Sequence, residues 1–164
     1  MTAPEAGIVA IGVVTNARDD RSDDGWAAES STIVLDDRFP IGATMGLEDF
    51  SHIEVIFRFH GVGDDEVTVD SRHPRGNTDW PRVGIFAQRA SKRPNRIAVT
   101  VCELTGVEGR SVHVRGLDAI DGTPVLDIKP VMTNFLPRGE VRQPAWVDEL
   151  MVDYWAGPPI GNDD

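Results

Sequence analysis

The sequence predicts a mainly β fold in one domain, with short helices and one amphipathic helix near the C-terminus. Three observations support this prediction. Short runs of β-branched and aromatic residues recur at close spacing, which is typical of a barrel or a sandwich. The sequence does not alternate strands with long helical patterns, as a repeating βαβ unit would. The chain has 164 residues, a length that suits one domain with a real hydrophobic core.

Seven segments are expected to be strands. The clearest is 52–60, where Ile53, Val55 and Phe57 alternate with polar residues, the period of a half-buried strand. The other six are rich in apolar or β-branched residues and comprise 8–14, 31–35, 83–87, 97–104, 112–117 and 124–128. Turns between them are expected at 64–65, 106–109 and 121–122.

One helix is predicted near the end of the chain. Pro144 stands at its start and Gly157 just past its end, which is the usual asymmetry of helix ends. Its apolar face, expected to pack against the core or a second subunit, consists of Trp146, Val147, Leu150, Met151, Tyr154 and Trp155. The barrel domain is therefore expected over 1–157, and 158–164 is expected to be a flexible tail. The polar segment 18–25 is expected to be a mobile lid or a linker.

Composition excludes several classes of protein. No apolar run approaches the length of a transmembrane helix, and the first residues lack the basic region of a signal peptide, so we expect a cytoplasmic protein without a membrane partner. The single cysteine, Cys102, cannot form an intramolecular disulfide and is expected to be a buried thiol. No metal is expected, because no His or Cys pair has metal-ligand spacing.

A cationic segment, residues 72–96, stands out in an acidic chain. It holds seven Arg or Lys residues and one acid, Asp79, whereas the whole chain carries a net charge of −11. Six of the seven cations are Arg, whose planar fork suits carboxylates and phosphates, so the segment is expected to bind an anionic group. The alternative is a solvated loop whose cations pair with neighbouring acids. The acidic remainder argues against a protein that coats nucleic acid broadly.

Known phosphate-binding and nucleophile motifs are missing. There is no GxGxxG after a strand, no P-loop and no GxSxG. Polar residues gather instead in the cationic segment, in 117–129, and at His60 at the end of its strand. Taken alone, the DGTP of 121–124 is an ordinary turn sequence, and a single histidine is usually structural.

Taken together, the motifs form a series along nearly the whole chain. They are IGVV (11–14), GLEDFSHIEVIFRFH (46–60), RHPRG (72–76), VGIFAQRASKRPNRIAVTVCEL (83–104), GLDAIDGTPVLDIKP (116–130) and PRGEVRQPAW (137–146). In this series the chain resembles the TsaA-like family, also called TrmO or YaeB, of S-adenosylmethionine-dependent methyltransferases. The resemblance implies a small single-domain β-barrel, a homodimer, and a cofactor site near the subunit interface. It also implies methylation of the exocyclic nitrogen of threonylcarbamoyladenosine beside the anticodon of tRNA.

The resemblance also assigns residues. Contacts to S-adenosyl-L-methionine are implied for Asp24, Gly25, Trp26, Phe86, Arg89, Arg93, Pro94, Leu104, Asp121, Gly122, Thr123 and Pro124. Catalytic candidates are His60, Arg89, Arg93, Asn95 and Asp118. Substrate-binding candidates, taken from the cationic segment, are Arg72, Arg75, Arg82, Lys92 and Arg96. Trp26 is expected to stack on the adenine, Arg89 or Arg93 to hold a carboxylate, and His60 or Asp118 to take a proton.

The chain departs from the family pattern at Ala90, Arg96 and Ala98, where the common form TRSPxRPNPIG has a hydroxyl residue, a proline and a glycine. These departures leave the acceptor open. Two alternatives therefore stand beside a tRNA methyltransferase. One is S-adenosylmethionine-dependent group transfer to a small molecule, which the short, acidic chain favours. The other is a non-catalytic cofactor-binding module. The ordered arginines and the DGTP turn argue against it, since a protein that only binds needs fewer aligned polar groups.

Overall fold

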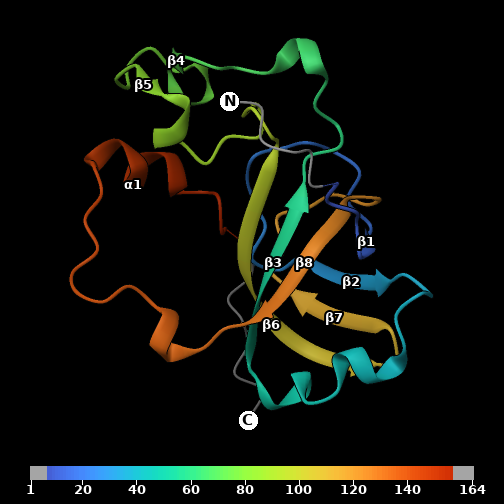
Figure 1. The fold of residues 1–164 in the computed structure, drawn as a ribbon. Helices are drawn as coiled ribbons and strands as arrows, with labels where there is room; N and C mark the ends of the chain where they lie inside the picture. Colours follow the sequence, from blue (N-terminus) through green and yellow to red (C-terminus); the bar gives the residue numbers. More distant parts are fainter. Residues whose placement is uncertain (1–6, 157–164) are drawn as a thin grey trace.

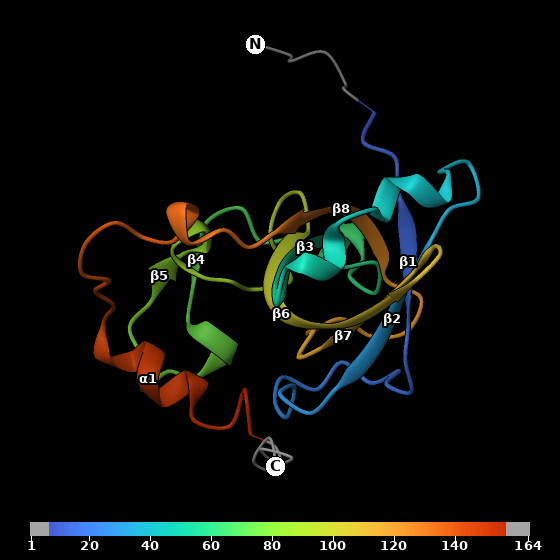
Figure 2. The same cartoon turned by 90° about the horizontal axis from the view of Figure 1, so that it is seen from below.

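Six antiparallel strands close a barrel in the computed structural model, which describes residues 7–156 (Figure 1). They are β1 (Gly12–Thr15), β2 (Ser30–Leu35), β3 (His52–Arg58), β6 (Ile97–Glu108), β7 (Ser111–Arg115) and β8 (Pro124–Pro130). Their order is β1-β2-β7-β6-β3-β8, and β1 pairs with β8 to complete the ring, which Figure 2 shows nearly end-on. The predicted mainly β barrel is confirmed.

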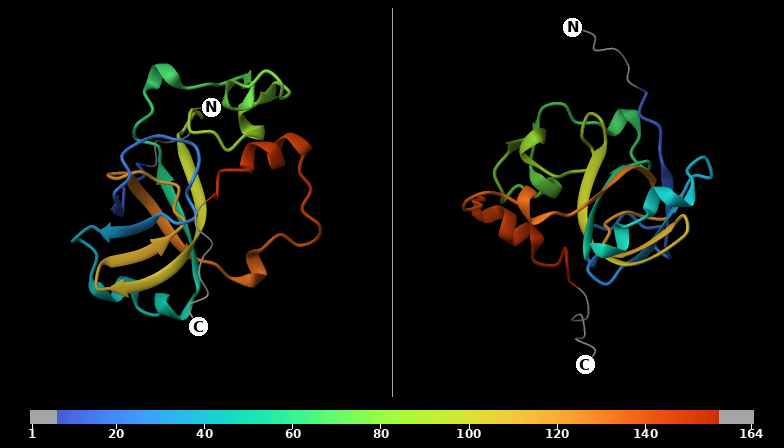
Figure 3. Two further views of the ribbon diagram at one scale, coloured as in Figure 1. Left: turned by 180° about the vertical axis from the view of Figure 1, so that it is seen from behind. Right: turned by 60° about the horizontal axis from the view of Figure 1, so that its bottom comes forward.

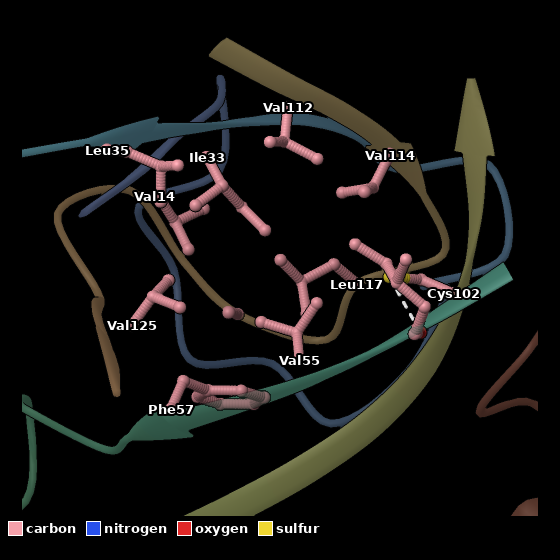
Figure 4. Close-up of a cluster of buried hydrophobic side chains, with 12 residues drawn as sticks. Val14, Ile33, Leu35, Val55, Phe57, Cys102, Val112, Val114, Leu117 and Val125 are labelled. Atoms are coloured by element: carbon pink, nitrogen blue, oxygen red, sulfur yellow. Dashed lines mark hydrogen bonds between the residues drawn. The ribbon is translucent and has the colours of Figure 1, made fainter. Parts of the chain in front are cut away.

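The barrel is filled by the inward-facing side chains of its strands. On β3, Ile53, Val55 and Phe57 are fully buried, as the alternation in the sequence predicted. Residues from the other strands meet them in one cluster (Figure 4). Cys102 belongs to this cluster and is a buried thiol, as predicted; burial, with a smaller contribution from the charge of Asp118, raises the pKa of the thiol to about 12.

The first strand and one of the turns differ most from the prediction. The first strand begins at Gly12 rather than at Ile8, because Ile8 remains exposed and outside the barrel. The turn predicted at 106–109 is wrong, since β6 continues to Glu108 and pairs with β7 along this stretch. The chain reverses at Gly109, whose φ of +61° suits glycine.

The segment 83–87 is not a barrel strand. Only β5 (Val83–Gly84) is extended, and it pairs with β4 (Ser71–Arg72) in a separate two-stranded sheet. A 3₁₀ turn, Ile85–Ala87, follows directly and buries Ile85. The β-branched residues that predicted a barrel strand are thus used to anchor a small sheet beside the barrel.

The predicted C-terminal helix is present but short. Helix α1 spans Ala145–Met151 and continues as turns, with Trp146, Leu150 and Tyr154 half-buried on one face. It lies beside the two-stranded sheet (Figure 2), and Trp80 Nε1 donates a hydrogen bond of 2.8 Å to a carboxylate oxygen of Glu149. Short 3₁₀ helices occupy Ile41–Thr44, Leu47–Asp49, Asp64–Glu66, Pro74–Gly76, Ile85–Ala87 and Thr133–Phe135.

Three further expectations concern the tail, a membrane-spanning helix and the loop 18–25. The tail 158–164 lies outside the described residues. Within 7–156, no helix has the length and apolar character needed to cross a membrane. The loop 18–25 connects two strands of the same barrel, so it is not a linker between domains.

The antiparallel order collects the polar motifs at one end of the barrel. Because neighbouring strands run in opposite directions, successive connections alternate between the two ends. Residues 16–29, 59–96 and 116–123 connect strands at the same end, which we call the loop end. Residues 36–51 and 109–110 connect strands at the other end. Figure 3 shows the 59–96 segment extending beyond the barrel at the loop end, with α1 nearby.

Candidate functional site

The turn 121–124 is fixed to β1 at the loop end. The Gly122 N–H donates to the Val14 carbonyl at 2.9 Å, and Thr123 is 2% exposed. One Asp121 carboxylate oxygen accepts the Asn16 N–H at 3.1 Å. Asp121 and Gly122 themselves are exposed, so the turn presents a carboxylate and open backbone at the surface. The turn predicted at 121–122 is confirmed.

His60 lies beside this turn. A Cβ built on Gly122 would be 3.8 Å from His60 Nε2, and Gly122 has φ of +76°. A residue with a side chain is disfavoured in that conformation, which accounts for glycine at this position. The structure thus brings together His60 and the glycine turn, which lie far apart in the sequence.

Asp118 lies between β6 and the C-terminal segment. The Thr100 hydroxyl donates to one of its carboxylate oxygens and the Tyr154 hydroxyl to the other. Burial first, and then the charge of Asp118, raise the pKa of Tyr154, while the positive charge of Arg89 acts in the opposite direction. Tyr154 therefore stays protonated and donates. Both oxygens of Asp118 already accept hydrogen bonds from protein side chains, which leaves less of this carboxylate for taking a substrate proton.

The arginine signature after β5 is organised around Gln88, which is 8% exposed. The Gln88 side-chain nitrogen donates to the Arg72 carbonyl at 3.2 Å, and Arg93 Nη1 donates to the Gln88 carbonyl at 3.0 Å. The Arg89 guanidinium donates to the Val99 carbonyl of β6. A buried amide thus fixes the backbone from which these arginines project.

Phe86, Pro94 and Asn95 flank the same arginines. Phe86 is 78% exposed, an unusual position for a phenylalanine and one that leaves an aromatic face open for stacking. Asn95 is exposed and Pro94 half-buried. Arg96 follows with φ of +54° and donates to the Val62 carbonyl at 2.9 Å.

Three of the seven cations in 72–96 pair with acids outside that segment. The pairs are Arg75–Asp24 at 2.7 Å, Lys92–Glu66 at 2.9 Å and Arg96–Asp64 at 2.6 Å. The hydrogen bond from Lys92, followed by that from the Gly63 N–H, lowers the pKa of Glu66 to about 2. For these three cations the structure matches the alternative of a charged loop paired with neighbouring acids.

The other four cations, Arg72, Arg82, Arg89 and Arg93, form no ion pair with the acids of residues 7–156. Arg82 donates instead to the Ser71 hydroxyl at 2.8 Å. Within the described part of the chain no carboxylate compensates the charge of these four guanidinium groups, which are therefore suited to an external anion.

Arg18 determines the shape of the loop 18–26. Its side chain is 12% exposed and donates to the carbonyls of Asp24 (2.7 Å) and Ser22 (3.1 Å). Its guanidinium also lies over the Trp26 ring, 3.4 Å from the ring centroid. Trp26 is only 5% exposed. The expected stacking of Trp26 on an adenine does not fit this arrangement, because the ring is buried and one face is already covered by a cation.

Leu104 stands apart from the other predicted cofactor residues. It packs against the core from β6, and its N–H donates to the carbonyl of Ser51 at 2.9 Å. Ser51 precedes β3, whereas His60 follows β3 at the loop end. The length of that strand therefore separates Leu104 from His60.

The sequence prediction missed four residues that organise this end: Asn16, Arg18, Thr100 and Tyr154. The Asn16 side-chain nitrogen donates to the Ala119 carbonyl at 2.8 Å and to the Ser31 hydroxyl at 2.9 Å, so it holds the 117–121 segment against β2. Only Tyr154 had a signal in the sequence, as a hydroxyl on an otherwise apolar helix face.

The described residues offer two further observations. A shallow hollow of about 470 Å³ lies over β2, β6 and β7, with Thr32 and His113 in its wall, away from the arginines. Residues 7–156 contain no group of three or more His, Cys, Asp or Glu side chains able to hold a metal ion. The candidate site is the loop end of the barrel, because the glycine turn, His60 and the arginines project there.

This arrangement defines an antiparallel β-barrel with one polar end suited to an anionic ligand. The chain belongs to the family described as tRNA-methyltransferase O N-terminal domain, whose model matches residues 21–135. The resemblance inferred from the sequence motifs is confirmed.

Known relatives differ in how much of their length this chain covers. It is 43% identical over 96 residues to the tRNA (adenine(37)-N6)-methyltransferase of Mus musculus, covering 58% of this chain and 22% of the mouse protein. It is 38% identical over 136 residues to a probable S-adenosyl-L-methionine-binding protein of Methanothermobacter thermautotrophicus, covering 79% of this chain and 93% of the relative. A crystal structure of TrmO from Pseudomonas aeruginosa superimposes with a TM-score of 0.65 and 30% identity, covering 87% of this chain and 62% of that protein. The chain thus spans under a quarter of the mouse enzyme and less than two thirds of this bacterial structure.

Proposed function

We propose that this protein is an S-adenosylmethionine-dependent N-methyltransferase that acts on the adenosine at position 37 of tRNA, beside the anticodon. Family membership and the relatives named as tRNA (adenine(37)-N6)-methyltransferases support the reaction. The resemblance in sequence motifs favours threonylcarbamoyladenosine as the form that is methylated, at its exocyclic nitrogen.

One observation carries the proposal. The barrel order places three separate connections at the loop end, and these contribute the 121–124 turn, His60, and the arginines after β5. A site built from several loops on a rigid barrel is the usual way in which a fold positions binding and catalytic groups. The four arginines without a carboxylate partner within residues 7–156 occupy these loops or the small sheet between them.

The residues present fit S-adenosylmethionine. Gly122 exposes its backbone beside His60, and Asp121 presents an exposed carboxylate that suits the hydroxyls of a ribose. The exposed ring of Phe86 suits an adenine. Arg89 or Arg93 would hold the carboxylate of the methionine end or that of the substrate. When bound, the cofactor supplies an activated sulfonium methyl group.

The protein's own part is to align and to accept a proton. Because the methyl group is already activated, orientation and exclusion of water provide most of the acceleration. His60 Nε2, which lies beside the glycine turn, would accept the proton that leaves the exocyclic nitrogen. Asn95, exposed next to Arg93, would orient the acceptor through its amide.

The proposed binding of tRNA divides the cationic segment into two groups. Arg72 and Arg82 are available to phosphates. Arg75, Lys92 and Arg96 already pair with acids, so they would need to exchange partners to touch the substrate. We assign these three a supporting role in shaping the loops.

A homodimer is part of the proposal. The segment after β8 carries apolar side chains that are strongly exposed, among them Phe135 at 85% and Val141 at 68%. Exposed apolar side chains gathered on one segment are typical of a subunit contact. Methylation of tRNA would place the protein in the cytoplasm.

A small-molecule acceptor is the second candidate. The relative from Methanothermobacter thermautotrophicus, which this chain covers almost completely, is named only for binding S-adenosyl-L-methionine. The net charge of −11 also makes broad contact with a nucleic acid unfavourable.

Two measurements test these proposals. Calorimetry in EDTA should show binding of S-adenosylmethionine to the purified protein; no binding in EDTA, with binding restored by a divalent ion, would contradict the proposed metal-free site. Mass spectrometry of tRNA nucleosides from a deletion strain should show loss of the methylated position-37 nucleoside. Unchanged nucleosides, together with intact cofactor binding, would favour the small-molecule acceptor.

A further inference from the structure

A short C-terminal segment, residues 152–156, follows α1 and lies against the loop 18–26. We call it the strap. The Gly25 N–H donates to the Asp153 carbonyl at 3.1 Å, and the Trp26 N–H donates to the Tyr154 carbonyl at 3.0 Å. Two consecutive residues of the loop are thus held by two consecutive carbonyls of the strap. Gly25 is among the residues expected to contact the cofactor, and Trp26 is buried beside it.

The strap is itself held to the barrel through one side chain. The Tyr154 hydroxyl donates to Asp118, and the other oxygen of Asp118 accepts from the Thr100 hydroxyl on β6. The Tyr154 ring packs edge-to-face on Trp155, with centroids 4.9 Å apart. Because its acceptor is charged, the hydrogen bond from Tyr154 to Asp118 is stronger than one between neutral groups. The barrel wall, the strap and the loop are thus joined by a continuous series of contacts.

A second contact also holds the loop. Arg75, next to the small sheet, pairs with Asp24 at 2.7 Å, and Trp80 from the same segment bonds to Glu149 of α1. The loop 18–26 therefore contacts both the cationic segment and the strap. The matched family region ends at residue 135, so the strap lies outside it.

We propose that Tyr154 and Asp118 are positioning residues, and that through them the strap fixes the loop 18–26 in the shape that the cofactor site requires. This inference rests on the proposed function for the role of the loop, but not for the contacts themselves. Asp118 is then a positioning residue and no longer a candidate base, because both of its carboxylate oxygens already accept hydrogen bonds.

The chain permits a direct optical test of the central contact. Tyr154 is the single tyrosine of the sequence, so tyrosinate absorbance reports on this residue alone. The charged groups that act on its hydroxyl are Asp118, Asp23 of the loop, and Arg89. We expect the wild-type tyrosine to resist ionisation well above the usual midpoint of about 10, and Asp118→Asn to lower its midpoint. A wild-type midpoint near 10 that Asp118→Asn leaves unchanged would overturn the contact.

Hydrogen exchange tests the consequence for the loop. In the protein without ligand, Tyr154→Phe should speed exchange of peptides covering 18–26 by roughly tenfold, because the strap loses its anchor. Peptides of β3 should stay protected, which shows that the barrel remains folded. The matched control is Val152→Ala, a change of similar size at a side chain that is 73% exposed on the same strap. Equal exchange of 18–26 in Tyr154→Phe and Val152→Ala would refute the positioning role.

Cofactor binding separates this inference from the proposed function. Tyr154→Phe should weaken binding of S-adenosylmethionine about tenfold, the order expected for loss of one hydrogen bond to a charged group, while Val152→Ala should bind as wild type. Failure of the wild-type protein to bind S-adenosylmethionine would contradict the proposed function. The absorbance and exchange measurements would still test whether Tyr154 and Asp118 hold the loop 18–26 through the strap. If Tyr154→Phe unfolds the barrel, Asp118→Asn replaces it in the same comparison, with faster exchange at 18–26 expected and wild-type exchange refuting the proposal.

Discussion

Replacing Arg89 or Arg93 with alanine is the most direct probe of the candidate site. Arg93 makes one hydrogen bond to the Gln88 carbonyl, at 3.0 Å, and Arg89 donates to the Val99 carbonyl. Neither arginine has a carboxylate partner among residues 7–156. Each substitution should therefore cost little more than one ordinary hydrogen bond of folding stability, about 1 kcal/mol.

The cost to ligand binding should be larger. If either guanidinium holds a carboxylate, its loss removes about 1.5–3 kcal/mol of binding or transition-state stabilisation, the range for a hydrogen bond to a charged group. Arg→Lys at the same position should restore only part of this, because a point charge cannot reproduce the bidentate fork. The assays are calorimetry for the cofactor and kcat/KM for methyl transfer.

One arginine at the other end of the barrel provides the control for binding, and a paired arginine provides a comparison for stability. Arg110→Ala removes a cation at the opposite end of the barrel, beside the turn after β6, and should leave both quantities unchanged. Arg75→Ala breaks the ion pair between Arg75, whose side chain is 25% exposed, and Asp24, whose side chain is 40% exposed. Because the pair is partly solvated, its loss should cost below about 1 kcal/mol of folding stability. Wild-type cofactor affinity and wild-type kcat/KM in both Arg89→Ala and Arg93→Ala would refute the site assignment.

Three further outcomes follow from single groups. Gly122→Ala should lower folding stability in denaturant by about 1 kcal/mol, because φ is +76° there, and it should weaken cofactor binding; wild-type values of both would contradict the open-turn argument. Cys102, 2% exposed with its pKa raised to about 12, should react with iodoacetamide at pH about 8 only after unfolding, and rapid alkylation of the native protein would count against its burial. Glu66 has its pKa lowered from 4.5 to about 2, so its contribution to stability is present above pH 4.5 and is lost as the pH falls towards 2. Glu66→Gln should therefore flatten the pH dependence of the free energy of unfolding between these values. An unchanged slope would show that the ion pair with Lys92 does not form in solution.

The fold was predictable where the sequence pattern is local. The alternation in 52–60 identified β3, because side-chain direction in a strand depends only on the neighbouring residues. The segment 83–87 has the same β-branched composition, yet only Val83–Gly84 is extended. Its partner is β4, Ser71–Arg72, and a two-residue pairing of this kind depends on a contact that no local pattern encodes.

The site was predictable in its motifs but not in its connections. The DGTP turn and His60 were identified separately, and their proximity depends on the closure of β8 against β1 and β3. The family resemblance assigned Trp26 to the adenine, and nothing in the surrounding polar loop indicated that its ring is buried. Its ring is covered by Arg18, a cation eight residues earlier that the sequence offered only as part of a charged loop.

The division of the cationic segment also limits the size of the anion that this end can bind. Acids from the loop 18–26 and from Asp64–Glu66 neutralise three of its seven cations, and the chain carries −11 overall. Four arginines suit one carboxylate and a few phosphates, and not a long nucleic-acid backbone. Since each phosphate contact on a single strand contributes about −0.7 to the slope of log K against log salt, binding of an anticodon stem-loop should show a slope no steeper than about −3. Arg72→Ala and Arg82→Ala should each reduce the slope by somewhat less than one, and Arg110→Ala should leave it unchanged. A much steeper wild-type slope would mean that the substrate contacts cations beyond the loop end, and would refute the view that this protein recognises a short segment around one nucleoside.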